Sequence, residues 1–259
     1  MAWKTVLFEI ADGVGTLTLN RPDKLNAFND QLHLDIADVI NQVENDKNIR
    51  ALVITGAGRG FCSGADLTQR IAPGSGAGDA LDQHYHPRLR RLKALAKPVI
   101  AAVNGPAAGA GMSLALACDI VIAAESAVFI QAFTRIGLVP DAGSTYFLPR
   151  LVGTARAKAL TLLAEPLSAR DAAAWGLILK AVPDAQLMEE AMAMARKLAA
   201  GPTFALGLTK QAIDQSLGND LDTQLSLERD FQKAASRSAD FREGVTAFLE
   251  KRAARFTGE

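Results

Sequence analysis

The stretch 97-KPVIAAVNGPAAGAGMSLALACD-119 decides the fold of this chain. Its five apolar residues 99–103 stand between turn-forming residues, which predicts a strand buried on both faces. From Ala108 onward small residues begin a helix whose first turn carries almost no side chains, so its free backbone N–H groups are open to close approach. Two interpretations stay open here: these groups bind an oxyanion, or the small residues only let a buried helix pack tightly.

The surrounding sequence predicts an α/β fold with strands crowded into the first half. An Asp-Gly pair at 12–13 joins two apolar runs and indicates a hairpin. Apolar residues at helical spacing predict an amphipathic helix over 29–45. Further buried strands are expected at 51–55, 120–124 and 128–130, and an extended piece at 175–178. From residue 154 onward the sequence is otherwise almost wholly helical.

A glycine-rich loop, 56-GAGRGFCSGADL-67, follows the strand predicted at 51–55. The carboxyl end of a parallel strand is where open α/β folds place their ligands. The loop matches neither a P-loop nor a dinucleotide-binding fingerprint. The small residues at 71–79 that follow it form either an active-site lid or a tolerated insertion.

Three polar features have two interpretations when they are considered alone. The turn 20–27 with its two cations is a solvated loop or a binding element. The charges interleaved with leucines at 88–97 are most simply the solvated face of a helix. Asp141, among apolar residues and glycine, is either a functional carboxylate or the cap of the helix that follows.

The composition excludes several classes of protein. The 259 residues carry no formal net charge, so nothing favours nucleic acid or an anionic membrane as partner. No long apolar run predicts a signal peptide or a membrane span, and we expect a cytoplasmic protein. Cys62 and Cys118 predict buried free thiols. No cluster of residues has metal-ligand spacing, so we expect neither a metal nor a redox cofactor.

We expect a core domain over 1–200 and a helical oligomerisation region over 201–259, because apolar helical faces such as those of the latter often contact a neighbouring subunit.

Several motifs in order make the chain resemble the crotonase, or enoyl-CoA hydratase/isomerase, superfamily over nearly its whole length. The motifs are 20-NRPDKLNA-27, 60-GFCSGADL-67, 103-VNG-105 through 109-GAG-111, 137-GLVP-140 and 247-AFLEKR-252. The resemblance implies a crotonase-like fold, with a repeated ββα core, parallel-rich sheets and a C-terminal helical region. It also implies a homotrimer or a dimer of trimers, and an acyl-CoA substrate that brings its own coenzyme A.

The resemblance further implies roles for individual residues. The backbone N–H groups of Ala65 and Ala110 correspond to the oxyanion hole that binds the thioester carbonyl, although the second position is commonly glycine in the family. The turn that includes Lys24 and Ala27, together with Ala65, Asp66 and Leu67, resembles the cradle for the CoA nucleotide, which favours binding as the role of that turn. Phe248 and Lys251 correspond to residues that reach the CoA of a neighbouring subunit.

The hydratases of the family use two glutamates, and the matching positions here hold Ser113 and Phe133. Asp141 stands where some non-hydratase branches, including an aryl-CoA dehalogenase, carry their acting aspartate. The segments 138-LVPD-141, 203-TFALGL-208 and 237-RSADFREG-244 resemble the branch of ring-1,2-epoxyphenylacetyl-CoA isomerases most. This branch opens a ring-fused epoxide to an oxepin and moves a 3,4 double bond to the 2,3 position. We therefore expect an isomerase that uses Asp141; the alternatives are a relaxed enoyl-CoA hydratase and a non-catalytic CoA- or RNA-binding member.

Overall fold

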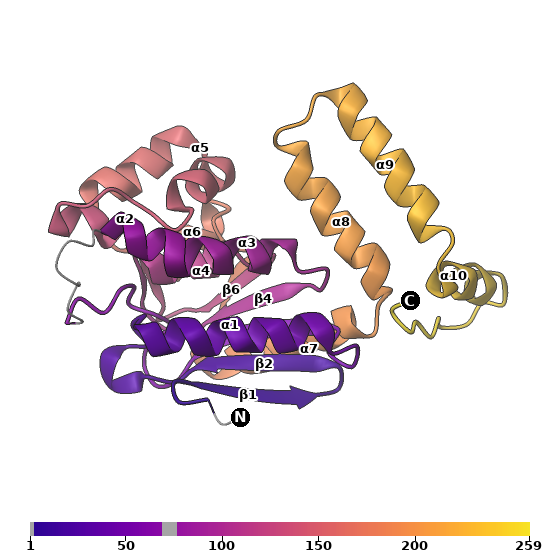
Figure 1. Ribbon diagram of the computed structural model, residues 1–259, viewed down its shortest axis with the longest axis horizontal. Coiled ribbons are helices and arrows are strands. Elements are labelled where there is room, and N and C mark those ends of the chain that lie inside the picture. Colours follow the sequence, from indigo (N-terminus) through magenta and orange to yellow (C-terminus); the bar gives the residue numbers. More distant parts are fainter. Residues whose placement is uncertain (1–2, 69–76) are drawn as a thin grey trace.

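The computed structural model describes residues 3–68 and 77–259 (Figure 1). Within these ranges the main sheet has the strand order β1-β2-β3-β4-β6-β9. Its strands are β1 (Val6–Ala11), β2 (Val14–Leu19), β3 (Ala51–Gly56), β4 (Val99–Val103), β6 (Ile120–Ala124) and β9 (Lys180–Val182). β1 and β2 pair antiparallel as the Asp-Gly turn predicts, whereas every later neighbour pairs parallel. The expected α/β fold with a parallel-rich sheet is confirmed.

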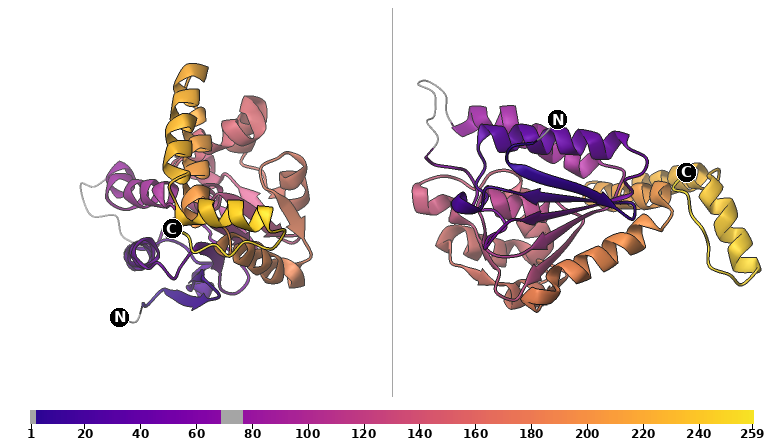
Figure 2. Two further views of the ribbon diagram at one scale, coloured as in Figure 1. Left: turned by 90° about the vertical axis from the view of Figure 1, so that its right-hand side faces the viewer. Right: turned by 90° about the horizontal axis from the view of Figure 1, so that it is seen from below.

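Helices cover both faces of this sheet, which explains why its central strands are continuously apolar. α1 (Asp30–Asn45) contacts β1 and β2, while α7 (Leu187–Ala199) lies across β2, β3, β4 and β6 on the other face (Figure 2). All residues of β3 and β4 are buried as a result. The side chain of Asn29 caps α1 by accepting the Leu32 N–H at 2.9 Å, so the helix begins where the sequence places it.

A second, smaller sheet lies immediately before helix α4 in the chain. Its strands, in the order β5-β7-β8, are β5 (Ala107–Ala108), β7 (Val128–Ile130) and β8 (Leu167–Ser168). β5 lies between β4 and α4 (Ala110–Leu116), and it pairs parallel with β7. The first turn of α4 is therefore fixed by a strand on its N-terminal side.

The remaining elements before residue 200 are helices around the two sheets. They are η1 (Pro22–Lys24), α2 (Ala77–Ala80), η2 (Leu81–Tyr85), α3 (His86–Ala94), η3 (Ala132–Ile136), α5 (Ser144–Leu163), α6 (Ala169–Ala174) and η4 (Asp184–Gln186). The lid expected at 71–79 lies mainly outside the described residues, and its last three residues belong to α2. The extended piece expected at 175–178 is wrong: these residues form a turn, and strand β9 comes two residues later.

The C-terminal helices α8 (Thr203–Ser216), α9 (Leu221–Ala235) and α10 (Ala239–Leu249) extend from the rest of the molecule (Figure 1). Large apolar side chains are exposed along them, among them Ile213 at 63%, Leu221 at 72% and Phe248 at 82%. No helix in the described part of the chain is long and apolar enough to cross a membrane. A boundary between residues 200 and 201 stays a prediction.

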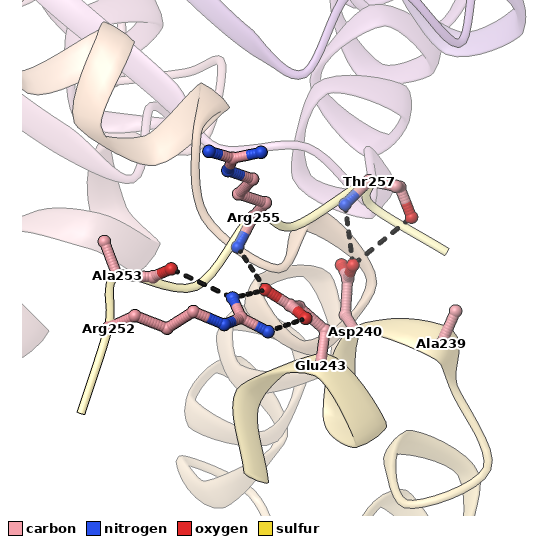
Figure 3. A pocket seen from close by; sticks show the side chains of 7 residues that line it. All are labelled: Ala239, Asp240, Glu243, Arg252, Ala253, Arg255 and Thr257. Atoms are coloured by element: carbon pink, nitrogen blue, oxygen red, sulfur yellow. Dashed lines mark hydrogen bonds and ion pairs between the residues drawn. The ribbon is translucent and has the colours of Figure 1, made fainter. Parts of the chain in front are cut away.

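The tail after α10 folds back onto that helix around a hollow of about 540 Å³ (Figure 3). Asp240, which is buried, accepts the N–H groups of Thr257 at 2.7 Å and Gly258 at 2.9 Å. Glu243 pairs with Arg252 at 2.6 Å. The Glu243–Arg252 pair ties the turn at residues 250–252, which includes Lys251 with φ 55°, to helix α10.

Candidate active site

The glycine-rich loop meets the N-terminus of α4. Gly64, with φ 93°, makes the approach possible: a methyl group at its Cα would lie 2.9 Å from the Ala108 carbonyl oxygen and 3.5 Å from the Ala110 nitrogen. The Ala108 N–H also donates to the Cys62 carbonyl at 2.9 Å. The structure thus brings together the two segments that contain Ala65 and Ala110.

Both of these alanines present a free backbone N–H group. Neither N–H has an acceptor among the described residues, whereas the nearby N–H groups of Asp66, Ala108 and Gly109 are paired. Ala110 is the first residue of α4, and the residue before it, Gly109, has φ 51° and no side chain to cap the helix. Ala65 is exposed whereas Ala110 is buried. Two such donors can stabilise negative charge that develops on one oxygen atom entering from outside.

Asp141 lies beside the same helix, in the loop between η3 and α5. Its backbone carbonyl accepts the hydroxyl of Ser113 at 3.3 Å, and Ser113 lies one turn into α4. The Asp141 side chain is half-buried, and its Oδ1 atom is fully buried without a hydrogen-bond partner in the described residues. Burial raises the pKa of this carboxyl to about 6, against a smaller lowering effect of the nearby His86.

The interpretation of Asp141 as a helix cap is wrong. The residue that caps α5 is Gly143, with φ 85°, and no side chain accepts a hydrogen bond from the first turn. Only the backbone carbonyl of Asp141 takes part, accepting the Ser144 N–H at 2.9 Å. A capping carboxylate would have a lowered pKa, so the raised pKa agrees with the contacts.

The two positions that match the hydratase glutamates are occupied by side chains that cannot exchange a proton as carboxylates. The Ser113 hydroxyl is buried and lies 2.6 Å from that of Ser144. The Phe133 ring faces the start of α4, where a methyl group on Gly109 would approach it to 3.7 Å. Neither Ser113 on α4 nor Phe133 on η3 therefore supplies a carboxylate beside Asp141.

The turn assigned to CoA binding is tied firmly to the glycine-rich loop. Asn26, fully buried and with φ 57°, donates from Nδ2 to the carbonyls of Gly60 at 2.8 Å and Ala57 at 3.0 Å. Lys24, at the end of η1, stays exposed, and Ala27 behind it is buried. Sequence reasoning missed the role of Asn26, although a polar residue between two apolar ones inside this turn was a usable signal.

Asp66 has a fixed partner within the chain. Its Oδ2 atom lies 2.8 Å from the Arg21 guanidinium, and its Oδ1 atom accepts the Thr68 hydroxyl at 2.6 Å. These hydrogen bonds lower the pKa of Asp66 to about 2. Leu67 beside it is 68% exposed. The assignment of Asp66 and Leu67 to CoA binding stays a prediction, while the role of Asp66 in shaping the loop follows from its contacts.

The interpretation of the charges at 88–97 as a solvated face fails for Arg88. This residue is 4% exposed, and it belongs to the buried side of α3. The available signal was its spacing, because Arg88 stands three residues after the buried Tyr85 and four before the buried Leu92. Sequence reasoning also missed a hollow of about 900 Å³ between α3, α5 and α8, with His86, Tyr146 and Phe147 in its wall.

Phe248 and Lys251 lie far from these features in their own chain. Figures 1 and 2 place α10 at the opposite end of the molecule from α2. The Phe248 side chain is 82% exposed. A role of these two residues at a neighbouring subunit stays a prediction. Within the described ranges, no three His, Cys, Asp or Glu residues gather as metal ligands would.

Comparison with known proteins places this geometry in a family. The model of the enoyl-CoA hydratase/isomerase family matches residues 9–259. A 1,2-epoxyphenylacetyl-CoA isomerase of Escherichia coli is 54% identical over 258 residues, which cover 98% of each chain. A probable enoyl-CoA hydratase of Rhodobacter capsulatus is 48% identical over the full length of both chains.

The fold agrees with these sequence relationships. A crystal structure of a putative enoyl-CoA hydratase from Streptomyces coelicolor matches with a TM-score of 0.93 at 37% identity, over 100% of this chain and 96% of that one. The expected crotonase-like fold is therefore confirmed. With its family model, its relatives and its fold in agreement, this chain belongs to the enoyl-CoA hydratase/isomerase family.

Proposed function

We propose that this protein is an acyl-CoA thioester isomerase in which Asp141 moves the proton. The N–H groups of Ala65 and Ala110 hold the thioester oxygen. The substrate we propose is 2-(1,2-epoxy-1,2-dihydrophenyl)acetyl-CoA, which is isomerised to the oxepin, with 3-enoyl-CoA esters as further substrates. The name of the Escherichia coli relative supports this choice of substrate.

The double-bond shift needs only one carboxylate. The ionised Asp141 removes a proton from C2 of a 3-enoyl-CoA, and the electron pair moves into a dienolate whose charge rests on the thioester oxygen. The two N–H donors stabilise that charge, at roughly 3 kcal/mol of barrier for one donor. The protonated Asp141 then returns the proton to C4, which leaves the double bond between C2 and C3 and restores the carboxylate.

The observation that supports this mechanism best is the environment of Asp141. Its Oδ1 atom is buried without a partner in the described residues, and its pKa is raised to about 6. A base of this pKa is ionised at neutral pH and remains a useful acid once protonated. Hydration would require a second proton-transfer group and a held water, and the positions that serve this purpose in hydratases hold Ser113 and Phe133.

The test is a product analysis with matched substrates. The protein is incubated separately with a 3-enoyl-CoA, a straight-chain 2-enoyl-CoA and the epoxide generated in situ. The products are separated by chromatography and identified by mass spectrometry. We expect isomers of unchanged mass from the first and the third substrate. In heavy water, protium kept at C4 of the recovered 2-enoyl-CoA would report direct return of the proton taken from C2, whereas deuterium at C4 would report that the Asp141 proton exchanged with solvent before its return. Addition of water to the 2-enoyl-CoA at a comparable rate, without isomerisation, would favour the hydratase alternative.

We further propose that the protein acts as a trimer or a dimer of trimers, with Phe248 and Lys251 reaching the CoA of a neighbouring subunit. The exposure of Phe248 at the far end from α2, and the fixed turn that bears Lys251, support this arrangement. Native mass measurement should give a multiple of three chains. A chain ending at Gly244 should bind CoA esters more weakly, and a fully active monomer would contradict the proposal.

A further inference from the structure

Arg88 is a buried cation without a carboxylate. The side chain is 4% exposed, and no acidic residue in the described ranges pairs with it. One guanidinium nitrogen, Nη1, lies 2.6 Å from Nδ1 of His33, while Nε is buried without an acceptor. Burial lowers the pKa of Arg88 to about 10, so the group stays charged at neutral pH. Because buried charges are costly unless paired, this arginine needs an explanation beyond space filling.

The guanidinium lies on aromatic rings instead. Its carbon is 4.3 Å from the centroid of the Phe28 ring and 5.2 Å from that of Tyr85. The His33 ring stacks on the Phe28 ring at 5.2 Å, at an interplanar angle of 14°. Since Nδ1 of His33 receives an N–H, that nitrogen is unprotonated. The planar cation and the stacked imidazole thus both contact the Phe28 ring while they are hydrogen-bonded to each other, an arrangement that lysine or methionine would not reproduce.

The main chain of Phe28 controls the peptide groups around Ala65. The Phe28 N–H donates to the Gly64 carbonyl at 2.7 Å, and the Phe28 carbonyl accepts the Asp66 N–H at 2.9 Å. These two hydrogen bonds form a single parallel bridge between Phe28 and Ala65. The bridge leaves the Ala65 N–H itself without an acceptor in the described residues. Phe28 therefore sets the direction in which this N–H points.

We propose that Arg88, together with His33, is a positioning residue for the oxyanion hole: it fixes the ring of Phe28, whose main chain aims the Ala65 N–H at the thioester oxygen. The inference rests on the proposed function, because it takes Ala65 as one of the two donors. It adds a determinant from α3, which supplies no residue to that donor pair. A donor must lie close to the position of the developing charge. A small change in the position or direction of the Ala65 N–H therefore reduces the rate strongly.

The test measures polarisation of the bound carbonyl directly. A cinnamoyl-CoA with a ¹³C-labelled thioester carbonyl has no proton at C4 to transfer, and recovery of its unchanged mass confirms that it stays intact. Its carbonyl stretching frequency is recorded free and bound, for the wild type and for the variants. We expect a downward shift on binding to the wild type, and loss of at least half of that shift in Arg88→Met. Turnover of a 3-enoyl-CoA should fall about tenfold to a hundredfold in kcat, with KM changed less than about threefold.

Two further variants test the route through Phe28. Phe28→Leu keeps the main-chain bridge but removes the ring, and it should lose a similar part of the shift. Combining it with Arg88→Met should add little, because both changes break the same link. Arg156→Met is the matched control: the exposed Arg156 on α5 lies over the ring of Trp175, the residue after α6, at 4.9 Å, and its loss should leave the shift unchanged.

The outcomes separate this inference from the proposed function. If the wild type shows no shift, the oxyanion hole itself is wrong. If the wild type shows the shift and Arg88→Met keeps all of it, the positioning role of Arg88 is overturned. Should Arg88→Met fail to fold, Arg88→Lys retains the charge without the planar fork and should show a reduced shift; a full shift there would overturn the role equally.

Discussion

Two aspartates near α4 have opposite environments. Asp66 is held by Arg21 at 2.8 Å and by Thr68, and these hydrogen bonds lower its pKa to about 2. Asp141 has a buried oxygen without a partner in the described chain, and its pKa is raised to about 6. The difference teaches that the two carboxylates suit different roles: Asp66 fastens two loops together as a permanent anion, whereas Asp141 has the environment expected of the proton-transfer group that we propose.

The comparison is tested by replacing each aspartate with asparagine, and the largest effect is expected at Asp141. Asp141→Asn should lose at least ~10²-fold in kcat on a 3-enoyl-CoA, because the amide cannot take up the proton. Binding of a CoA ester, followed by calorimetry, should stay close to that of the wild type. If Asp141→Asn keeps near-full turnover, the base is elsewhere and the comparison fails.

The pH dependence of the rate sharpens the assignment of Asp141. Because the base must be ionised, kcat/KM should fall about tenfold per pH unit below the pKa of about 6 and level off above it. A profile between pH 4.5 and 8 measures this directly. The residual rate of Asp141→Asn should be flat over the same range. A wild-type profile without a change of slope near pH 6 would contradict the role of an Asp141 carboxylate with a raised pKa as the base.

Most of this site follows from the sequence, since backbone geometry can be predicted from glycine and small residues. The loop 56–67 and the turn before α4 lie where their composition indicates, and strands β3 and β4 are buried as their apolar runs predict. Backbone donors such as those of Ala65 and Ala110 need only the correct fold. The likeness to the family then supplies what the residues alone leave open.

What the sequence did not reveal depends on contacts between distant segments. Arg88 reads as part of a solvated charge run, because its partners Phe28 and His33 come from another part of the chain. The capping interpretation of Asp141 failed for a related reason: helix α5 begins at Ser144, after a glycine in a left-handed conformation, and not at the carboxylate. The residues next to Arg88 and Asp141 in the sequence do not show whether the first is solvated or whether the second caps a helix.

The Arg21–Asp66 ion pair should matter for stability and for CoA affinity more than for chemistry. Asp66→Asn removes the charge from a pair whose side chains are 16% and 7% exposed, which should cost about 2 kcal/mol and several degrees in Tm. Because the loop next to Ala65 loosens, KM should rise more than kcat falls. Thermal unfolding and steady-state kinetics check both parts. A loss of kcat as large as that of Asp141→Asn would erase the distinction between the two aspartates.

The smallest expected effect is a difference in how stability depends on pH. For Asp141, whose pKa is raised on folding, stability is fully present below the unfolded value near 3.8 and is lost as the pH rises through about 6. Asp141→Asn does not ionise, so its Tm should exceed that of the wild type by a few degrees at pH 7.5, and this gain should vanish near pH 4.

For Asp66 the sign is reversed: its pKa is lowered, so its contribution is present above about 3.8 and is lost as the pH falls toward 2. Asp66→Asn should therefore be less stable than the wild type at pH 7.5, with the deficit shrinking in acid. Melting curves of the three proteins from pH 2 to 7.5 measure both differences, and parallel curves would show that the two carboxylates have the same environment after all.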